Sequence, residues 1–311
     1  MVIATTPLLA LGGIVTTRRV GMSDPVWPTT PWYLFFTSWQ EPRPGFLIEH
    51  SHRLAGWFLG ALTIVFAVAI WKTARPRGLR WLGIACLAAV SFQGLLGGMR
   101  VYLDALAGPE LAAFHGCSAQ VVFCILISAV FFTSASRPRS PLPEDVRARL
   151  RGTTLTLVLL VFMQLIWGSI VRHNPTPLMQ RLHLFTAFAV VSVAVWSILS
   201  AQTLDASGRL RRSHSLLGMF LVVQVVLGIE AWMGKFASGI LWDLQTPTTG
   251  QIIVRTAHVL VGTGIFATSV VLVLQTREVK RTLPSEPVPS DAPNVDRDLA
   301  LAGAGDRRGT S

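Results

Sequence analysis

Charged residues are scarce in this chain, and their scarcity is the first guide to its class. Only 14% of the 311 residues are charged and 51% are hydrophobic, whereas a soluble domain carries about 25% charged residues. Lipid is therefore expected to be the solvent for most of the chain. The formal net charge of +11 does not indicate nucleic-acid binding, because the Lys and Arg residues lie in short gaps between apolar runs.

Cysteine is also scarce. Cys86, Cys117 and Cys124 all fall inside apolar runs, which argues against a disulfide framework or a thiolate metal site. The sequence has no CxxC pair, no Walker loop and no Rossmann fingerprint. Any chemistry must therefore come from other residues.

Long apolar runs are what the sequence has in abundance. A helix needs about 20 apolar residues to cross a membrane, and seven stretches meet or approach that length. An eighth stretch, at 3–17, is shorter and begins almost at Met1, as a wrongly assigned start site would cause. It lacks the basic region and the cleavage site of a signal peptide, so we count it as a helix. We predict an all-α, polytopic membrane protein with eight transmembrane helices. The seven longer stretches are 54–71, 81–99, 111–133, 152–171, 182–204, 215–233 and 256–276.

The positions of Lys and Arg predict the orientation. Most of the 27 basic residues lie in the gaps at 72–80, 134–151 and 205–213 and in the tail after 276, so the positive-inside rule makes these gaps and both termini cytoplasmic. Residues 283–311, rich in Pro, Ser, Asp and Gly, are predicted to be a disordered cytoplasmic tail.

The sequence repeats itself. A Gln-x-x-x-Gly segment occurs in the third, fifth and seventh predicted helices, and a histidine opens the even-numbered helices of each half. We therefore predict two duplicated four-helix bundles, at 1–137 and 150–282. Close helix packing alone would explain the small residues, but it would not explain histidines in register. The segments run from Gln93 to Gly97, Gln164 to Gly168 and Gln224 to Gly228.

Four of the seven histidines share one predicted position: His52, His115, His183 and His258 each lie in the first turn or two of an even-numbered helix, near the outer face. A single such histidine is more often a packing residue, but four at one depth favour a ligand set. His50 is interpreted as a surface or supporting residue, and His173 and His214 as interfacial.

The grouping of these histidines, two in each half, narrows the ligand. Structural zinc prefers a closed tetrahedral set, and copper would want Met or Cys beside the imidazoles. A pair of imidazoles in a four-helix bundle suits haem. Arg53, Arg181 and Arg255 lie close in sequence to three of the histidines and are candidate partners for haem propionates, or else snorkelling anchors.

One acidic residue breaks the symmetry. Glu49 lies three residues before His52, on nearly the same helix face, whereas the second half has Gln180 at the equivalent place. A carboxylate there is either a reacting group or a helix N-terminal acid favoured by the dipole. The asymmetry suggests a reaction site in the first half and a haem held only by ligands in the second.

These residues resemble the haem A synthase family, also called the cytochrome oxidase assembly family, over residues 8 to 276. The resemblance rests on a set of short segments together with the histidines of helices four, six and eight. The segments are Gly12-Gly13-x-Val15, Asp24-Pro25-x-Trp27-Pro28 and Glu49-x-x-His52-Arg53.

The resemblance implies a reaction in which the C8 methyl of haem O is oxidised to a formyl group, through hydroxylation and loss of water. It implies that His52 and His115 hold haem O, that His183 and His258 hold an electron-relaying haem b, and that Glu49 acts at the reacting methyl. The expected setting is the cell inner membrane. Haem O synthase and the cytochrome oxidase assembly machinery are the expected partners, and homo-oligomerisation is left open.

The sequence departs from the family pattern at two points, and three other functions are considered. Residues 18–48 lack the cysteine pair that many bacterial members carry, and the first helix is short. A dihaem b electron carrier would fit the four histidines equally well. A transporter is disfavoured because broken helices and midplane charges are missing, and a haem O prenyltransferase because Asp-rich magnesium motifs are missing.

Overall fold

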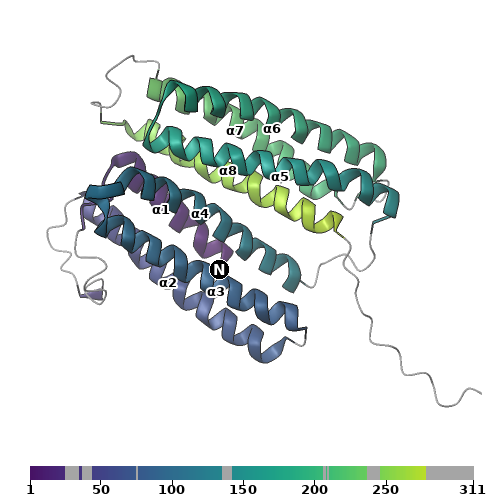
Figure 1. Cartoon of the computed structure of the whole chain (residues 1–311), viewed down its shortest axis with the longest axis horizontal. Helices are drawn as coiled ribbons and strands as arrows, with labels where there is room; N and C mark the ends of the chain where they lie inside the picture. The colour runs from purple at the N-terminus through teal and green to yellow at the C-terminus, as the bar shows by residue number, and fades with distance from the viewer. Residues whose placement is uncertain are drawn as a thin grey trace, which may run out of the picture. The chain divides into compact units, whose positions relative to one another are not determined.

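The computed structural model describes residues 1–24, 35–36, 44–74, 76–134, 142–205, 208, 210–236 and 246–277. Within these residues it contains eight helices and no strand (Figure 1), which confirms the all-α prediction. The helices are α1 (Val2–Arg18), α2 (Pro44–Thr73), α3 (Arg77–Tyr102), α4 (Asp104–Thr133), α5 (Glu144–His173), α6 (Pro177–Leu204), α7 (Arg211–Phe236) and α8 (Thr249–Thr276).

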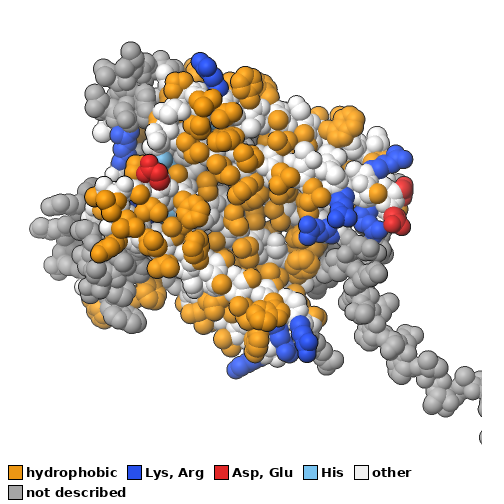
Figure 2. Space-filling model, viewed as in Figure 1, with side chains coloured by type: hydrophobic (Ala, Val, Ile, Leu, Met, Phe, Trp, Pro, Cys, Tyr) orange, Lys and Arg blue, Asp and Glu red, His pale blue; other side chains and the backbone are white. Residues whose placement is uncertain are grey.

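Seven of these helices, α2 to α8, are long and apolar enough to cross a membrane, with mean hydropathies of 1.7 to 2.1. Figure 2 shows hydrophobic side chains over the middle of the viewed face and charged side chains toward its ends. The chain is therefore a multi-pass membrane protein. The eighth helix, α1, has 17 residues and is about 25 Å long, somewhat less than the hydrocarbon core of roughly 30 Å.

The helices begin well before the apolar runs that predicted them. The run at 54–71 belongs to a helix that starts at Pro44, and the run at 256–276 to one that starts at Thr249, because helical hydrogen bonding continues through turns in which polar residues interrupt the apolar run. A capping box fixes the start of α8: the Thr248 side chain accepts from the Gln251 backbone N–H, and the Gln251 side chain accepts from that of Thr248.

The longer helices shift three of the histidines by about one turn relative to the prediction of the first turn or two. Counted from the helix starts, His183 lies in the second turn and the other three lie in the third; in α4 the count starts at Gly108, after the kink at Ala107 (φ −150°, ψ 33°). The apolar run marks only the lipid-crossing part of a helix, which is why the sequence placed them too close to the ends.

The helices of Met1–Arg277 form two sets of neighbours (Figure 1). Consecutive helices pack from α1 to α4, and α1 also contacts α4; consecutive helices pack from α5 to α8, and α5 also contacts α8. The sets meet where α1 and α4 face α5 and α8, and α8 is the most buried long helix. Duplication, with bundles at 1–137 and 150–282, stays a prediction, and residues 283–311 lie outside the described residues.

Candidate functional site

Each of the four histidines packs against a glycine of the preceding helix. A Cβ atom added to any of these glycines would lie 3.0 to 3.2 Å from the histidine Cε1 atom, closer than ordinary van der Waals contact. Glycine is therefore what lets each imidazole edge approach the neighbouring backbone. The pairs are Gly12 with His52, Gly97 with His115, Gly168 with His183, and Gly228 with His258.

The glutamine of each Gln-x-x-x-Gly segment contacts the same ring. The Gln93 amide nitrogen lies 3.2 Å from His115 Nδ1 and donates to the His115 carbonyl at 2.8 Å. In the second half the distances from amide nitrogen to histidine Nε2 are 3.4 Å and 3.3 Å. The spacing of four residues puts glutamine and glycine one turn apart on one helix face, so both meet one histidine. The second-half pairs are Gln164 with His183 and Gln224 with His258.

Hydroxyl groups orient two of these amides. Ser118 Oγ donates to Gln93 Oε1 at 2.6 Å, and Thr186 Oγ1 donates to Gln164 Oε1. Each hydroxyl lies three residues after its histidine, on the same face of the helix. With the oxygen of the amide engaged, its nitrogen is the atom turned toward the imidazole. Gln224 has no such partner, and its Oε1 is buried without a hydrogen bond among the described residues.

His52 is held differently. The position in α1 that corresponds to the glutamine is Leu8, four residues before Gly12, and the Leu8 carbonyl oxygen lies 3.1 Å from His52 Nδ1. A carbonyl can only accept a hydrogen bond, so Nδ1 of His52 carries the proton and Nε2 carries the lone pair. This is a common arrangement for a metal-ligating histidine.

The second-half histidines come together as a pair. The ring centroids of His183 and His258 are 6.4 Å apart and their planes meet at 70°. Two metal–nitrogen bonds of about 2 Å each, plus the distance from each nitrogen to its ring centre, span roughly 6 Å. Nδ1 of each ring is buried and lacks a hydrogen-bond partner among the described residues. The spacing fits an iron held between two imidazoles.

The first-half histidines are also neighbours. His52 and His115 are close enough for their charges to interact, and Arg100 acts on both. The Arg100 guanidinium donates to the Gly21 carbonyl at 3.1 Å, while its Nε atom is buried without a partner among the described residues. Arg100 thus brings a positive charge to this pair, a role that sequence reasoning did not give it.

Glu49 belongs to a buried network of charges at the start of α2. Its Oε1 atom pairs with Arg53 at 2.7 Å, and its Oε2 accepts from the Asp24 backbone N–H at 2.8 Å. Asp24 Oδ2 pairs with Arg53 at 2.9 Å and contacts His50 Nδ1 at 3.2 Å. Glu49 is 3% exposed and both Asp24 and His50 are 0% exposed, so His50 is a supporting residue rather than a surface residue.

The three arginines expected near propionates have different surroundings. Arg53 is committed to Asp24 and Glu49, and Arg181 is exposed. Arg255 donates to the Gly234 carbonyl at 2.7 Å at the end of α7, and its Nε is buried without a partner among the described residues. Of the three, Arg255 is the one with a buried N–H group that has no partner among the described residues, and it lies three residues before His258.

Sequence reasoning missed the residues at the end of α5. Arg172 donates to the Gly13 carbonyl at 2.6 Å and to Thr17 Oγ1 at 2.7 Å, linking α5 to α1, and its charge acts on His258. His173, the next residue, interacts with His115. Arg172 therefore lies near a histidine of the second pair and His173 near a histidine of the first. Their adjacency at a predicted outer helix end was the available signal.

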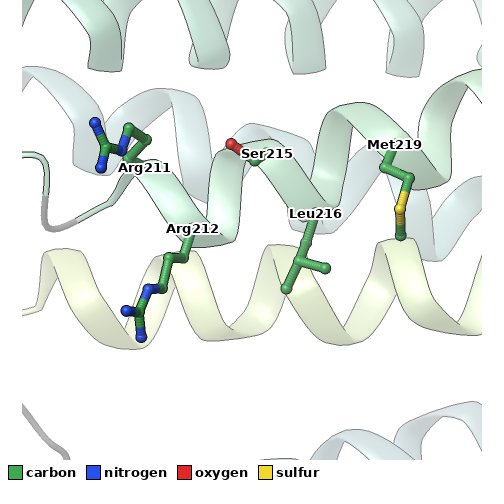
Figure 3. Close-up of a pocket in the computed structure, with 5 residues that line it drawn as sticks. All are labelled: Arg211, Arg212, Ser215, Leu216 and Met219. Atoms are coloured by element: carbon green, nitrogen blue, oxygen red, sulfur yellow. The ribbon is translucent and has the colours of Figure 1, made fainter.

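A surface depression is formed along α7 by Arg211, Arg212, Ser215, Leu216 and Met219 (Figure 3). All five side chains come from one helix. They lie in the N-terminal half of this helix, and neither the four histidines nor their glutamine partners line the depression. The depression is therefore separate from the histidine pairs, and His214, beside it in sequence, is buried against Ser197 at 3.2 Å.

Comparison with known protein families shows which family this chain belongs to. Residues 1–179 match the family described as cytochrome oxidase assembly protein. The chain belongs to this family. The match covers the first histidine pair with its charged network, and it extends into α5 and the start of α6.

Individual relatives agree in name but are distant. A haem A synthase of Allorhizobium ampelinum is 24% identical over 217 residues, covering 59% of this chain and 60% of the relative. One of Shouchella clausii is 26% identical over 215 residues, covering 64% and 70%. One of Rhizorhabdus wittichii is 30% identical over 125 residues, covering 40% of this chain and 36% of the relative. The chain thus spans about a third to two thirds of these relatives. No solved structure matches the chain.

Proposed function

We propose that this protein is a haem A synthase, which oxidises the C8 methyl of haem O to a formyl group. The observation that carries the proposal is the arrangement of four histidines on even-numbered helices. Each faces a glycine of the preceding helix, and the second-half pair has ring centroids 6.4 Å apart. The relatives named haem A synthase support the same reaction, and the equivalent contacts in α1–α4 and α5–α8 support duplication.

The two pairs would hold different haems. His52 and His115 would hold haem O as substrate, and His183 and His258 would hold haem b, which supplies one-electron transfer when bound. The chain's own contribution is to fix the imidazoles by the glycine contacts and by Leu8 and the three glutamines. Most of the surrounding helix surface is apolar, which suits a porphyrin and excludes water.

Glu49 would act beside the substrate haem, as a base or by stabilising positive charge. Its carboxylate is fixed by Arg53 and by the Asp24 N–H, so its position is defined before any substrate binds, as electrostatic catalysis requires. Because both oxygens already accept hydrogen bonds, stabilising charge is the better-supported of the two roles.

Propionates would be met by basic groups at this end of the helices. Arg255 and Arg100 each keep a buried nitrogen without a partner among the described residues, so they fit this role better than Arg53, whose charge is balanced, or Arg181, which is exposed. Placement in the inner membrane with both termini cytoplasmic, and cooperation with haem O synthase and the oxidase assembly machinery, complete the proposal; homo-oligomerisation remains open.

The test is to identify the haems that the protein holds. The full chain is expressed with a source of haem O, purified, and its haems are separated by reversed-phase chromatography. We expect haem b and haem A from the wild type, and haem b without haem A from His52→Ala. Absence of haem A from the wild type would refute the synthase. Glu49→Gln should retain both haem sites but lose conversion; wild-type conversion would refute the role of Glu49.

A dihaem b electron carrier is the second candidate. The engagement of both Glu49 oxygens in a buried network favours it, because a purely structural Glu49 would leave no reacting group beside the first pair. This candidate predicts haem b in both halves, even when haem O is supplied.

A further inference from the structure

The four histidines differ in which partner meets their ring nitrogens. A neutral imidazole has one N–H and one lone pair, and a metal needs the lone pair. A side-chain amide nitrogen has hydrogens but no available lone pair, so it can only donate. A ring nitrogen that meets an amide nitrogen must therefore be the one with the lone pair.

Three histidines meet such an amide. The Gln93 amide nitrogen lies 3.2 Å from Nδ1 and 3.5 Å from Nε2 of His115, so it meets whichever of the two carries the lone pair. The Nε2 atoms of His183 and His258 meet Gln164 and Gln224 at 3.4 Å and 3.3 Å. For His115 the amide orientation is independently fixed, because the amide nitrogen of Gln93 lies 2.8 Å from the His115 carbonyl oxygen, which can only accept a hydrogen bond. In each case the glutamine occupies the electron pair that iron would use.

His52 is the exception. Leu8 stands where the other odd-numbered helices have glutamine, and its carbonyl takes the Nδ1 proton at 3.1 Å. The lone pair is then on Nε2, for which the described residues provide no hydrogen-bond donor. His52 is held in place without being capped.

We propose that Gln93, Gln164 and Gln224 are placeholders that cap the ligating nitrogens in the haem-free protein and yield to iron, and that uncapped His52 is the ligand that an entering haem engages first. This inference rests on the proposed haem-binding function. It gives a physical difference between the halves: in the first half a haem displaces one amide, and in the second half it displaces two. Easier exchange in the first half suits a substrate that enters and leaves.

Haem titration of the haem-free full chain tests the proposal. The protein is purified in detergent from haem-depleted cells and titrated with iron protoporphyrin IX, with binding followed by Soret absorbance. The second-half site is isolated with His52→Ala and the first-half site with His183→Ala. Gln164→Leu and Gln224→Leu, which each remove a cap, are made in the His52→Ala background. Leu8→Gln, which adds a cap, is made in the His183→Ala background.

Removing a cap should raise haem affinity about fivefold, the factor that one neutral hydrogen bond contributes, and adding one should lower it by a similar factor. The first-half site should also load faster than the second. Gln275→Leu, which removes a glutamine of α8 whose Oε1 has no partner among the described residues, is the matched control and should not change haem affinity.

The outcomes separate the possibilities. If wild-type protein takes up no haem, the proposed function fails, and this inference with it. Suppose that wild-type protein binds haem but that the haem affinity of Gln164→Leu and Gln224→Leu equals that of Gln275→Leu or is lower. The inference alone is then overturned, because a glutamine with only a structural role would, when removed, lower haem affinity and thermal stability together. Should Leu8→Gln fail to fold, the two glutamine variants still decide.

Discussion

The two halves of the molecule hold their histidines by the same glycine contact but surround them with different chemistry. In α1–α4, His52 lies beside buried Glu49, Arg53 and Asp24, which form ion pairs with one another. In α5–α8 the side chains that hydrogen-bond around the rings are neutral, namely Gln164, Gln224 and Thr186, and the nearby charge of Arg172 has no buried carboxylate beside it among the described residues. The scaffold sets where an imidazole lies, and the neighbouring side chains decide whether the site carries a reactive charge.

The largest expected effect comes from breaking the charged network. Arg53→Met leaves the carboxylates of Asp24 and Glu49 buried without their cation, which should lower the free energy of unfolding by about 3–5 kcal/mol. Arg181, the arginine two residues before His183 in the second half, is exposed, so Arg181→Met should change the free energy of unfolding by less than about 0.5 kcal/mol. Thermal unfolding in detergent measures both. Equal effects would show that the halves do not differ in this way.

The fold was largely accessible from the sequence, because lipid imposes long apolar runs and each run predicted a helix. The starts of the helices were not, since polar residues such as Glu49, His50 and Arg53 interrupt the apolar pattern before the run at 54–71. This is why the histidines were placed about one turn too near the helix starts.

The site was accessible in part. The spacing of glutamine and glycine, and the register of the histidines, were visible as a repeat, but which glycine meets which histidine depends on contacts between helices. The position of Asp24 could not be foreseen, because 25 residues of chain separate it from Glu49. Arg53 looked available for propionates because one of its two partners, Asp24, lies on another segment of the chain.

A smaller effect is expected from the glycines, and here the halves should respond alike. Gly168→Ala would place Cβ 3.0 Å from His183, and Gly97→Ala would place it 3.2 Å from His115. Moving each ring aside should cost about 1–3 kcal/mol and reduce the haem content of the affected half only. Haem quantification per half, read by chromatography of haem b and haem A, measures this. Gly60→Ala, where nothing lies within 4 Å, is the control and should retain both haems.

The smallest expected effect tests the boundary between the halves. Thr263 in α8 donates to Gln120 in α4, and both side chains are buried, so Thr263→Val removes a hydrogen bond that joins the two sets of helices. The loss should be about 1 kcal/mol, whereas Thr203→Val, at an exposed position of α6, should have almost none. Neither histidine pair takes part in this bond, so unfolding should shift while the haem content of both halves stays the same. Loss of haem from one half alone would mean that the boundary also positions the histidines, and the two halves could then no longer be treated as separate sites on a shared scaffold.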